Sequence, residues 1–544
     1  MAALSGFLVV LLLQGCVSPN QDAAVPDLIL HNGRIYTGHA SQPWVEAISV
    51  RGENVLAIGE SRALLNAATP RTRIIDLAGH MAMPGIIDAH DHPGNVPFGA
   101  TADAGASPIS DPPLGVVAAA VERTARSAVS GEWVQVVAGP AAMSDVKAAR
   151  DALDKAGGDR PVAMVAWWGH GVILNSRGIA EIGLSENTRD LIGGRLDRDA
   201  DGRITGKLEE YAGWQVLRQL QSSTSEDKRA ASLRAYADRR LIEGVTSVQV
   251  MAGDQTPGAF ANTVKQARLP IRLRIIRFPI GASEVDGNDP WAFLKSSLPP
   301  RISVSGIKWI LDGTPMERLA YQSTPYRSQP GWRGRQNFTI EHLRVQLERA
   351  LAGGEPLLLH AVGDAMAVVV LDEMERMAPP EKWRSARVRL EHADGITGPQ
   401  IERARRLGIV LAQPRPTALF GDWLRAGIPV AYGSDMGFPP FVMLAAMTAS
   451  DNPQAISREQ GLAVLTRWPA YAEFSENRKG VLAPGMLADV AVLSQDVTTV
   501  PGSDLPRTKS LLTLVGGQIA YMSPEFASKA GRKIIPNALE NGRD

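Results

Sequence analysis

Cysteine is almost absent from this 544-residue sequence, in which Cys16 is the single example. One cysteine cannot form an internal disulfide, and it cannot supply the several thiolates of a cysteine-based zinc site. Net charge is also lacking, because 57 Lys and Arg residues balance 57 Asp and Glu residues. We therefore have no electrostatic reason to expect a nucleic-acid partner. The Gly-x-Ser-x-Gly motif of serine hydrolases is missing as well, which removes one common hydrolytic mechanism.

Long hydrophobic runs are scarce near the N-terminus. Leu8–Leu13 form an apolar run that is too short to cross a bilayer and leads directly into Gln14-Gly15-Cys16. Residues 1–15 resemble a bacterial lipoprotein signal peptide, after whose cleavage Cys16 would be the lipidated first residue. The absence of Lys and Arg from residues 1–6 departs from that pattern, so an ordinary secretory signal with a chance cysteine is the alternative.

The lipoprotein resemblance implies a location for the protein. Residues 16–26 would form a tether, and the lipid on Cys16 would anchor the chain to a membrane of the bacterial cell envelope. Val17, rather than an aspartate, follows the cysteine, and by the same resemblance this favours the outer membrane facing the periplasm.

The two ends of the mature chain share a pattern of short strands and glycine turns. Strand-like runs begin at Leu28–Leu30, and Asn32-Gly33 predicts a tight turn before the next run. Similar runs follow Gly480, and neither set is large enough to close a core easily on its own. We therefore expect residues 27–83 and 480–525 to build one β-sandwich domain.

Between these ends, strand-like runs alternate with helical stretches, which is typical of parallel strands joined by helices. The eight expected strands are Gly85–Ala89, Val245–Val250, Ile271–Phe278, Val304–Leu311, Pro356–His360, Arg387–Glu391, Gly408–Ala412 and Pro429–Tyr432. Eight such units predict an α/β fold, a (β/α)₈ TIM-type barrel over residues 84–479. The interval at about 93–230 has strand-like runs of its own, at 133–137 and 162–166, and is interpreted as an insertion after barrel strand 1 that caps the barrel mouth.

Histidines stand at the ends of several predicted strands. His90 and His92 alternate along the first strand, so their side chains point to the same face. His360 and His392 end the fifth and sixth strands, and Asp435 follows the eighth. The carboxyl ends of barrel strands meet at one rim, where these side chains suit zinc or a similar divalent ion. A lone histidine is more often a core or surface residue, and Asp435 alone could cap a helix, but the matched positions favour a metal site.

With these residues the chain resembles the metal-dependent amidohydrolase superfamily, and more closely its YtcJ-like branch, amidohydrolase family 3. The matching motifs are Pro84–His92, Gly244–Gln249, Gly306–Lys308, Leu311–Gly313, His360–Asp364, Glu391–Ala393 and Gly433–Asp435. The resemblance covers about residues 27–521. It departs at Val250, where many relatives carry an aspartate, so no role is carried over to that position.

The resemblance implies roles for three further residues. Lys308 matches a lysine that many superfamily members carboxylate to bridge two metals, so the site would hold one or two ions; a lysine paired with a carboxylate is the alternative. His170 lies in a segment that reaches over the pocket in this branch, which implies substrate contact or oxyanion stabilisation, whereas packing beside two tryptophans is the alternative. Asp312 would either orient a ligand or shape a turn.

Together these features predict a metal-dependent amidohydrolase that cleaves a carbon–nitrogen, amide-type, non-peptide bond of a small substrate. The metal would activate a water and polarise the carbonyl, while Asp435 would act as general base and then general acid. Two alternatives stay open: a lactone, ester or cyclic-amide hydrolase of the same superfamily, and a non-catalytic metal-binding lipoprotein. The oligomeric state is also open, with dimers the commonest arrangement.

Overall fold

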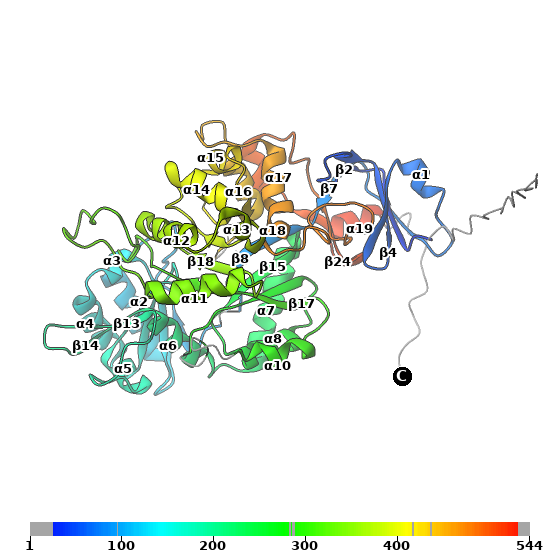
Figure 1. The fold of residues 1–544 in the computed structure, drawn as a ribbon. Helices are drawn as coiled ribbons and strands as arrows, with labels where there is room; N and C mark the ends of the chain where they lie inside the picture. Colours follow the sequence, from blue (N-terminus) through cyan, green and yellow to red (C-terminus); the bar gives the residue numbers. More distant parts are fainter. Residues whose placement is uncertain are drawn as a thin grey trace, which may run out of the picture.

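The computed structural model describes residues 25–94, 96–281, 284, 289–415, 418–435 and 438–530. The predicted signal peptide and Cys16 lie outside these residues. Within the described ranges, no helix is both long and apolar enough to cross a membrane. Figure 1 shows a central barrel with a β-rich unit at one end and a mixed α/β unit at the other.

Eight parallel strands form the central sheet, and all eight lie where the sequence predicted them. In spatial order they are β8 (Ile86–Asp91), β15 (Val245–Ala252), β16 (Arg272–Arg277), β17 (Ile302–Ile310), β18 (Leu357–His360), β19 (Arg389–Glu391), β20 (Val410–Gln413) and β21 (Val430–Tyr432). Just past β21, the backbone N–H of Asp435 donates to the carbonyl oxygen of His90 on β8 at 2.8 Å. The last strand therefore lies beside the first, and the predicted (β/α)₈ barrel is confirmed.

Helices follow the strands and cover the outside of the barrel. They are α7 (Glu226–Ile242), α8 (Pro257–Ala267), α10 (Trp291–Leu294), α11 (Ile340–Leu351), α12 (Asp364–Met377), α13 (Pro380–Ala386), α14 (Pro399–Leu407), α15 (Phe420–Arg425), α16 (Pro440–Met447), α17 (Arg458–Leu465) and α18 (Arg467–Ala472). Leu233 and Leu241 of α7 share one buried core with Val248 of β15. Because helices cover one face and side chains fill the other, barrel strands read as continuous apolar runs.

Two sheets from both ends of the chain form the β-rich unit in Figure 1, as predicted. One sheet runs β5 (Asn54–Gly59), β4 (Ala47–Arg51), β1 (Leu28–His31), β6 (Arg73–Asp76). The other runs β24 (Gln518–Met522), β23 (Ser510–Val515), β22 (Val490–Leu493), β7 (Met81–Pro84), β2 (Arg34–Tyr36), β3 (Trp44–Val45). Leu30, Ile48, Val490 and Leu512 share the buried core of this unit.

The tight turn at Asn32-Gly33 carries the chain between these two sheets. The strand before it, β1, pairs with β4 and β6, whereas the strand after it, β2, pairs with β3 and β7. Asn32 has a φ of 55°, a left-handed conformation that asparagine tolerates better than most residues. The turn is therefore a corner of the sandwich and does not join two paired strands.

Gly85 separates the sandwich from the barrel. It stands between β7 and β8, and its N–H donates to the carbonyl oxygen of Asp489 at 2.9 Å. A Cβ at this position would lie 2.2 Å from Oγ1 of Thr246 on β15, closer than real atoms approach. Glycine is required here because the backbone passes directly against the neighbouring barrel strand.

The interval after β8 forms a sheet of its own with helices packed on it. Its strands, in spatial order, are β13 (Gly194–Arg198), β14 (Ile204–Glu210), β12 (Val172–Leu174), β11 (Val162–Ala166), β10 (Val134–Ala138) and β9 (Ala100–Ala102). Its helices are α2 (Leu114–Ser127), α3 (Pro140–Met143), α4 (Val146–Gly157), α5 (Ser176–Ile182) and α6 (Tyr211–Gln221). The predicted strands at 133–137 and 162–166 correspond to β10 and β11.

Candidate metal centre

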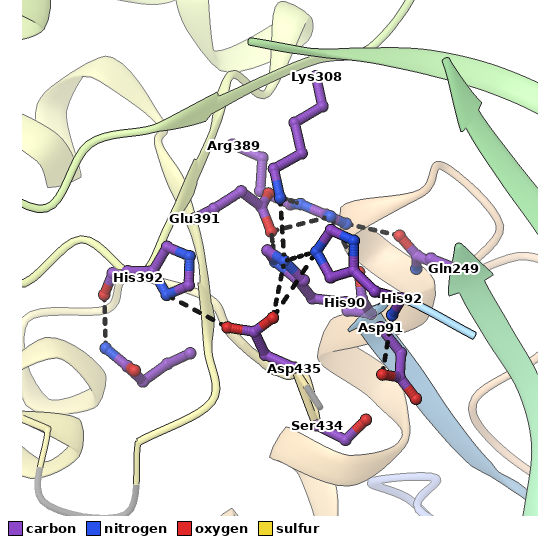
Figure 2. Close-up of polar contacts among 12 residues, drawn as sticks. His90, Asp91, His92, Gln249, Lys308, Arg389, Glu391, His392, Ser434 and Asp435 are labelled. Atoms are coloured by element: carbon purple, nitrogen blue, oxygen red, sulfur yellow. Dashed lines mark hydrogen bonds and ion pairs between the residues drawn. The ribbon is translucent and has the colours of Figure 1, made fainter. Parts of the chain in front are cut away.

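Three of the predicted ligands lie within reach of a single ion. His90 Nε2 is 3.3 Å from His92 Nε2, and Oδ1 of Asp435 is 3.6 Å and 3.7 Å from these two nitrogens. Figure 2 shows the three side chains pointing toward one another. They come from the ends of β8 and β21, which closure of the barrel places side by side. All three ligand atoms lie within 4.8 Å of one another, which suits coordination by one ion.

The other two histidines extend this cluster around the rim. His392 Nδ1 lies 3.9 Å from Oδ2 of Asp435, and the His392 ring is 4.5 Å from that of His360. His360 is buried, and neither of its ring nitrogens has a hydrogen-bond partner among the described residues. A buried imidazole without any partner is destabilising, whereas a metal ion is a partner that neutral imidazole binds well. His360 therefore fits a metal centre better than it fits an ordinary core.

Lys308 reaches the cluster from β17. Its Nζ lies 3.1 Å from Nε2 of His90, and the side chain is buried. Burial lowers the pKa of Lys308 to about 8, which leaves a substantial fraction of uncharged amine at mildly alkaline pH. Only the uncharged amine can add carbon dioxide, so the local environment is compatible with carboxylation of this lysine.

The four imidazoles are held in the form that binds metals. Burial, and then the charge of Lys308, keeps the pKa of both His90 and His92 well below the usual value. Burial likewise lowers the pKa of His360 and His392. Neutral imidazole is the ligand form, so these side chains need not lose a proton before an ion binds.

A carboxylate that the sequence analysis left without a role orients His90. Oε2 of Glu391 accepts a hydrogen bond from Nδ1 of His90 at 2.5 Å, leaving Nε2 to face His92 and Asp435. Arg389 forms an ion pair with Glu391 and thereby holds that carboxylate. Ligand histidines commonly pair their second nitrogen with a carboxylate, which fixes the tautomer and the ring orientation. The only signal in the sequence was a glutamate directly before His392.

Asp88 connects the backbone at His90 with the backbone next to Asp435. Its Oδ1 accepts hydrogen bonds from the backbone N–H groups of His90 at 3.1 Å and Ser434 at 3.0 Å. Arg240 of α7 forms an ion pair with the same carboxylate. The contact to Ser434 joins β8 to the segment that carries Asp435, so Asp88 holds the backbones of these candidate ligands in register.

Asp312 holds backbone in a similar way. Its carboxylate accepts N–H hydrogen bonds from Val362 at 3.0 Å, Gly363 at 2.8 Å and Tyr321 at 2.8 Å. Two of these donors directly follow the strand that ends in His360. Asp312 therefore fixes the loop that follows His360, and the two roles predicted for it, orienting a ligand and shaping a turn, stay predictions. Val250, the position that departs from the family pattern, is a fully buried apolar residue of β15.

His170 enters the same region from the inserted sheet. It lies between β11 and β12, and its ring is 5.0 Å from the ring of His360. Burial lowers the pKa of His170, but the charge of Glu210 outweighs this effect and raises the pKa to about 9. His170 also packs at 5.3 Å against the ring of Trp214. The structure thus places His170 beside the candidate ligands and, at the same time, against a tryptophan.

Comparisons with known proteins identify a family model and similar chains. The model of the amidohydrolase family matches residues 73–521. The Bacillus subtilis (strain 168) protein YtcJ, named as an amidohydrolase, is 26% identical over 538 residues, covering 91% of this chain and 99% of YtcJ. An N-substituted formamide deformylase of Arthrobacter pascens is 24% identical over 547 residues, covering 91% and 98%. The fold resembles that of an uncharacterized metal-dependent hydrolase of Pyrococcus horikoshii OT3, with a TM-score of 0.64, 20% identity and coverage of 88% and 99%.

Proposed function

Because this chain belongs to the amidohydrolase family and is a metal-dependent hydrolase, we propose that it cleaves an amide-type, non-peptide carbon–nitrogen bond of a small substrate. The observation that carries this proposal is the meeting of four neutral imidazoles, a buried lysine and a carboxylate at one rim of the barrel. The relative named as an N-substituted formamide deformylase supports formamides as the first substrates to test.

The donor set supports zinc as the ion. The proposed ligands are His90, His92, His360, His392 and Asp435, and Lys308 would add a further oxygen ligand once carboxylated. Imidazole nitrogens and carboxylate oxygens are the ligands that zinc and similar divalent ions prefer. The unpartnered nitrogens of His360 support its place in this set. One or two ions would fit such a set.

In the proposed reaction, a bound divalent ion would lower the pKa of a water to about 7 and polarise the substrate carbonyl. Asp435 accepts the proton of the attacking water as a new carbon–oxygen bond forms. It then donates that proton to the nitrogen as the carbon–nitrogen bond breaks, which releases an acid and an amine. Burial raises the pKa of Asp435 to about 6, so the carboxylate is the main form at neutral pH while its conjugate acid stays accessible.

His170 would stabilise the carbonyl oxygen as negative charge develops on it. A pKa of about 9 leaves the ring of His170 positively charged at neutral pH, and this ring lies 5.0 Å from that of His360. A preorganised donor aimed at a developing oxyanion contributes about 2.7–4 kcal/mol in known enzymes.

The same residues would also open a lactone, an ester or a cyclic amide, so these compounds belong in the substrate panel.

Metal removal and readdition test the proposal directly. Purified protein would be assayed with N-substituted formamides, other small N-acyl compounds, lactones and esters, while bound metal is measured by mass spectrometry. We expect turnover of amide-type substrates that disappears on chelation and returns with zinc. Turnover that persists unchanged in metal-free protein would refute the proposal. A metal-loaded protein that hydrolyses nothing in the panel would favour the non-catalytic alternative.

We also propose that Cys16 carries a lipid that anchors the enzyme in the cell envelope. This proposal rests only on the resemblance of residues 1–15 to a lipoprotein signal peptide. Expression of the full chain and of a Cys16→Ser variant in a bacterial host, with a radiolabelled fatty acid, would test it. Labelled protein should sediment with membranes, and the variant should be unlabelled. Equal labelling of both would rule out Cys16 as the site.

A further inference from the structure

We propose that Glu210 is a positioning residue, which fixes the ring of His170 so that its Nε2 faces the metal centre. This inference rests on the proposed function, because it assigns a task to His170 in that reaction. Glu210 ends β14 of the inserted sheet and is fully buried. Glu210 belongs to none of the motifs found in the sequence, and it lies outside the barrel strands.

The contacts of Glu210 select one nitrogen of the imidazole. Its Oε1 and Oε2 lie 3.1 Å and 3.2 Å from Nδ1 of His170. Nδ2 of Asn337 donates to Oε2 of the same carboxylate at 3.3 Å, which holds it from a second side. With Nδ1 engaged, Nε2 is the nitrogen left for a substrate beside His360. The arrangement matches the one in which Glu391 orients His90.

The segment that carries His170 is firmly attached to its surroundings. Nε1 of Trp214 donates to the carbonyl oxygen of Gly169 at 2.9 Å. Nε1 of Trp168 donates to Oε2 of Glu317 at 2.7 Å, and Glu317 belongs to the long connection after β17. Gly169 and Gly171 adopt φ angles of 83° and 121°, which non-glycine residues rarely reach. His170 is therefore held between two glycines at a defined place.

Two features of Glu210, its burial and its backbone conformation, are energetically unfavourable. A fully buried carboxylate loses its solvation by water, and its hydrogen-bond partners must offset that loss. Glu210 also has a φ of 53°, a strained value for a residue of its type. Strain and a buried charge together mark functional positions more often than merely structural ones.

A double-mutant cycle on the zinc-loaded, full-length enzyme tests the inference. We expect Glu210→Gln and His170→Asn each to lower kcat by about 10- to 100-fold with little change in KM. The double variant should be no slower than His170→Asn, because Glu210 acts only through that ring. Losses that multiply in the double variant would show that Glu210 acts independently, and would overturn the inference. So would a Glu210→Gln variant with unchanged kcat.

Control variants separate positioning from folding. Glu209→Gln changes the adjacent residue of β14, which pairs with Lys207 and Arg335, and should leave kcat unchanged. Glu210→Asp keeps the charge but shortens the side chain, so a smaller loss of kcat is expected, and it replaces Glu210→Gln if that variant does not fold. A bound ion lost on Glu210→Gln would overturn the inference in favour of a second metal site at His170, Glu210 and Glu317.

Crystal structures test the positioning role of Glu210 independently of the proposed function. A wild-type enzyme that is inactive on the whole substrate panel would refute the function and leave the ring to be examined directly. In zinc-loaded crystals, Nδ1 of His170 should face Glu210 in the wild type, and the ring should rotate or become disordered in Glu210→Gln. An unchanged ring in both structures would refute the positioning role.

Discussion

Replacement of Asp435 by asparagine separates proton transfer from the structural roles of this residue. Asp435 has a φ of 38°, in the left-handed region that asparagine tolerates better than most residues. Its backbone N–H donates to the carbonyl oxygen of His90, and this bond is unaffected by the change. The variant should therefore keep the fold and the closure of β8 against β21, while its amide can no longer accept a proton.

The size of the expected loss follows from that missing step. A positioned general base and acid contributes about 100- to 10,000-fold to a rate. At about 1.36 kcal/mol per factor of ten, this corresponds to about 2.7–5.4 kcal/mol in the activation free energy. We therefore expect kcat of Asp435→Asn to be about 100- to 10,000-fold lower than that of the wild type. Asp422→Asn, a change on the outer helix α15 that alters a pair with Arg425, should stay near the wild-type value.

The pH profile provides a second readout of the same variant. Burial raises the pKa of Asp435 to about 6, and a bound cation would lower it again. The base works only when deprotonated, so wild-type kcat/KM should fall at acidic pH, with a midpoint at or below about 6, and should stay level from 7 upward. Asp435→Asn should lack this acid limb. Metal content measured beside the rates would show whether the ion is retained. A metal-loaded variant with more than a tenth of the wild-type kcat would refute the role of Asp435 in proton transfer.

Three further changes probe the ligand geometry and the fold. Glu391→Gln should weaken zinc binding by about 10- to 100-fold, because Glu391 no longer orients the His90 imidazole. Competition with a chelator would measure the affinity, and an unchanged affinity would contradict this prediction. Lys308→Met should remove one metal equivalent and abolish any response of wild-type activity to added bicarbonate, and a variant that binds as much metal as the wild type would exclude Lys308 as a ligand. Gly85→Ala should destabilise the protein by about 1–3 kcal/mol in thermal unfolding, since its Cβ would overlap Thr246, while Gly59→Ala, with open space around it, should change little. Equal stability of the two alanine variants would refute that reasoning.

Much of the fold was predictable because its signals are local. Barrel strands are buried on both faces, so each one appears in the sequence as a short apolar run, and all eight were found. His90 and His92 share a face because side chains alternate along any strand. The inserted sheet was only partly predicted: β10 and β11 are apolar runs, whereas β13 and β14 carry several polar and charged side chains, and β9 and β12 have three residues each.

The sequence by itself determined which residues could bind a metal and at which strand ends they stand. Only the tertiary structure decided how those residues are oriented. Glu391 meets His90 across 301 positions of the chain, and Glu210 reaches His170 only because β14 pairs with β12 in the inserted sheet. Local patterns specify strands and the direction of their side chains. Contacts between distant carboxylates and imidazoles depend on barrel closure and on the contacts of the inserted sheet with the barrel, which no short stretch of sequence records.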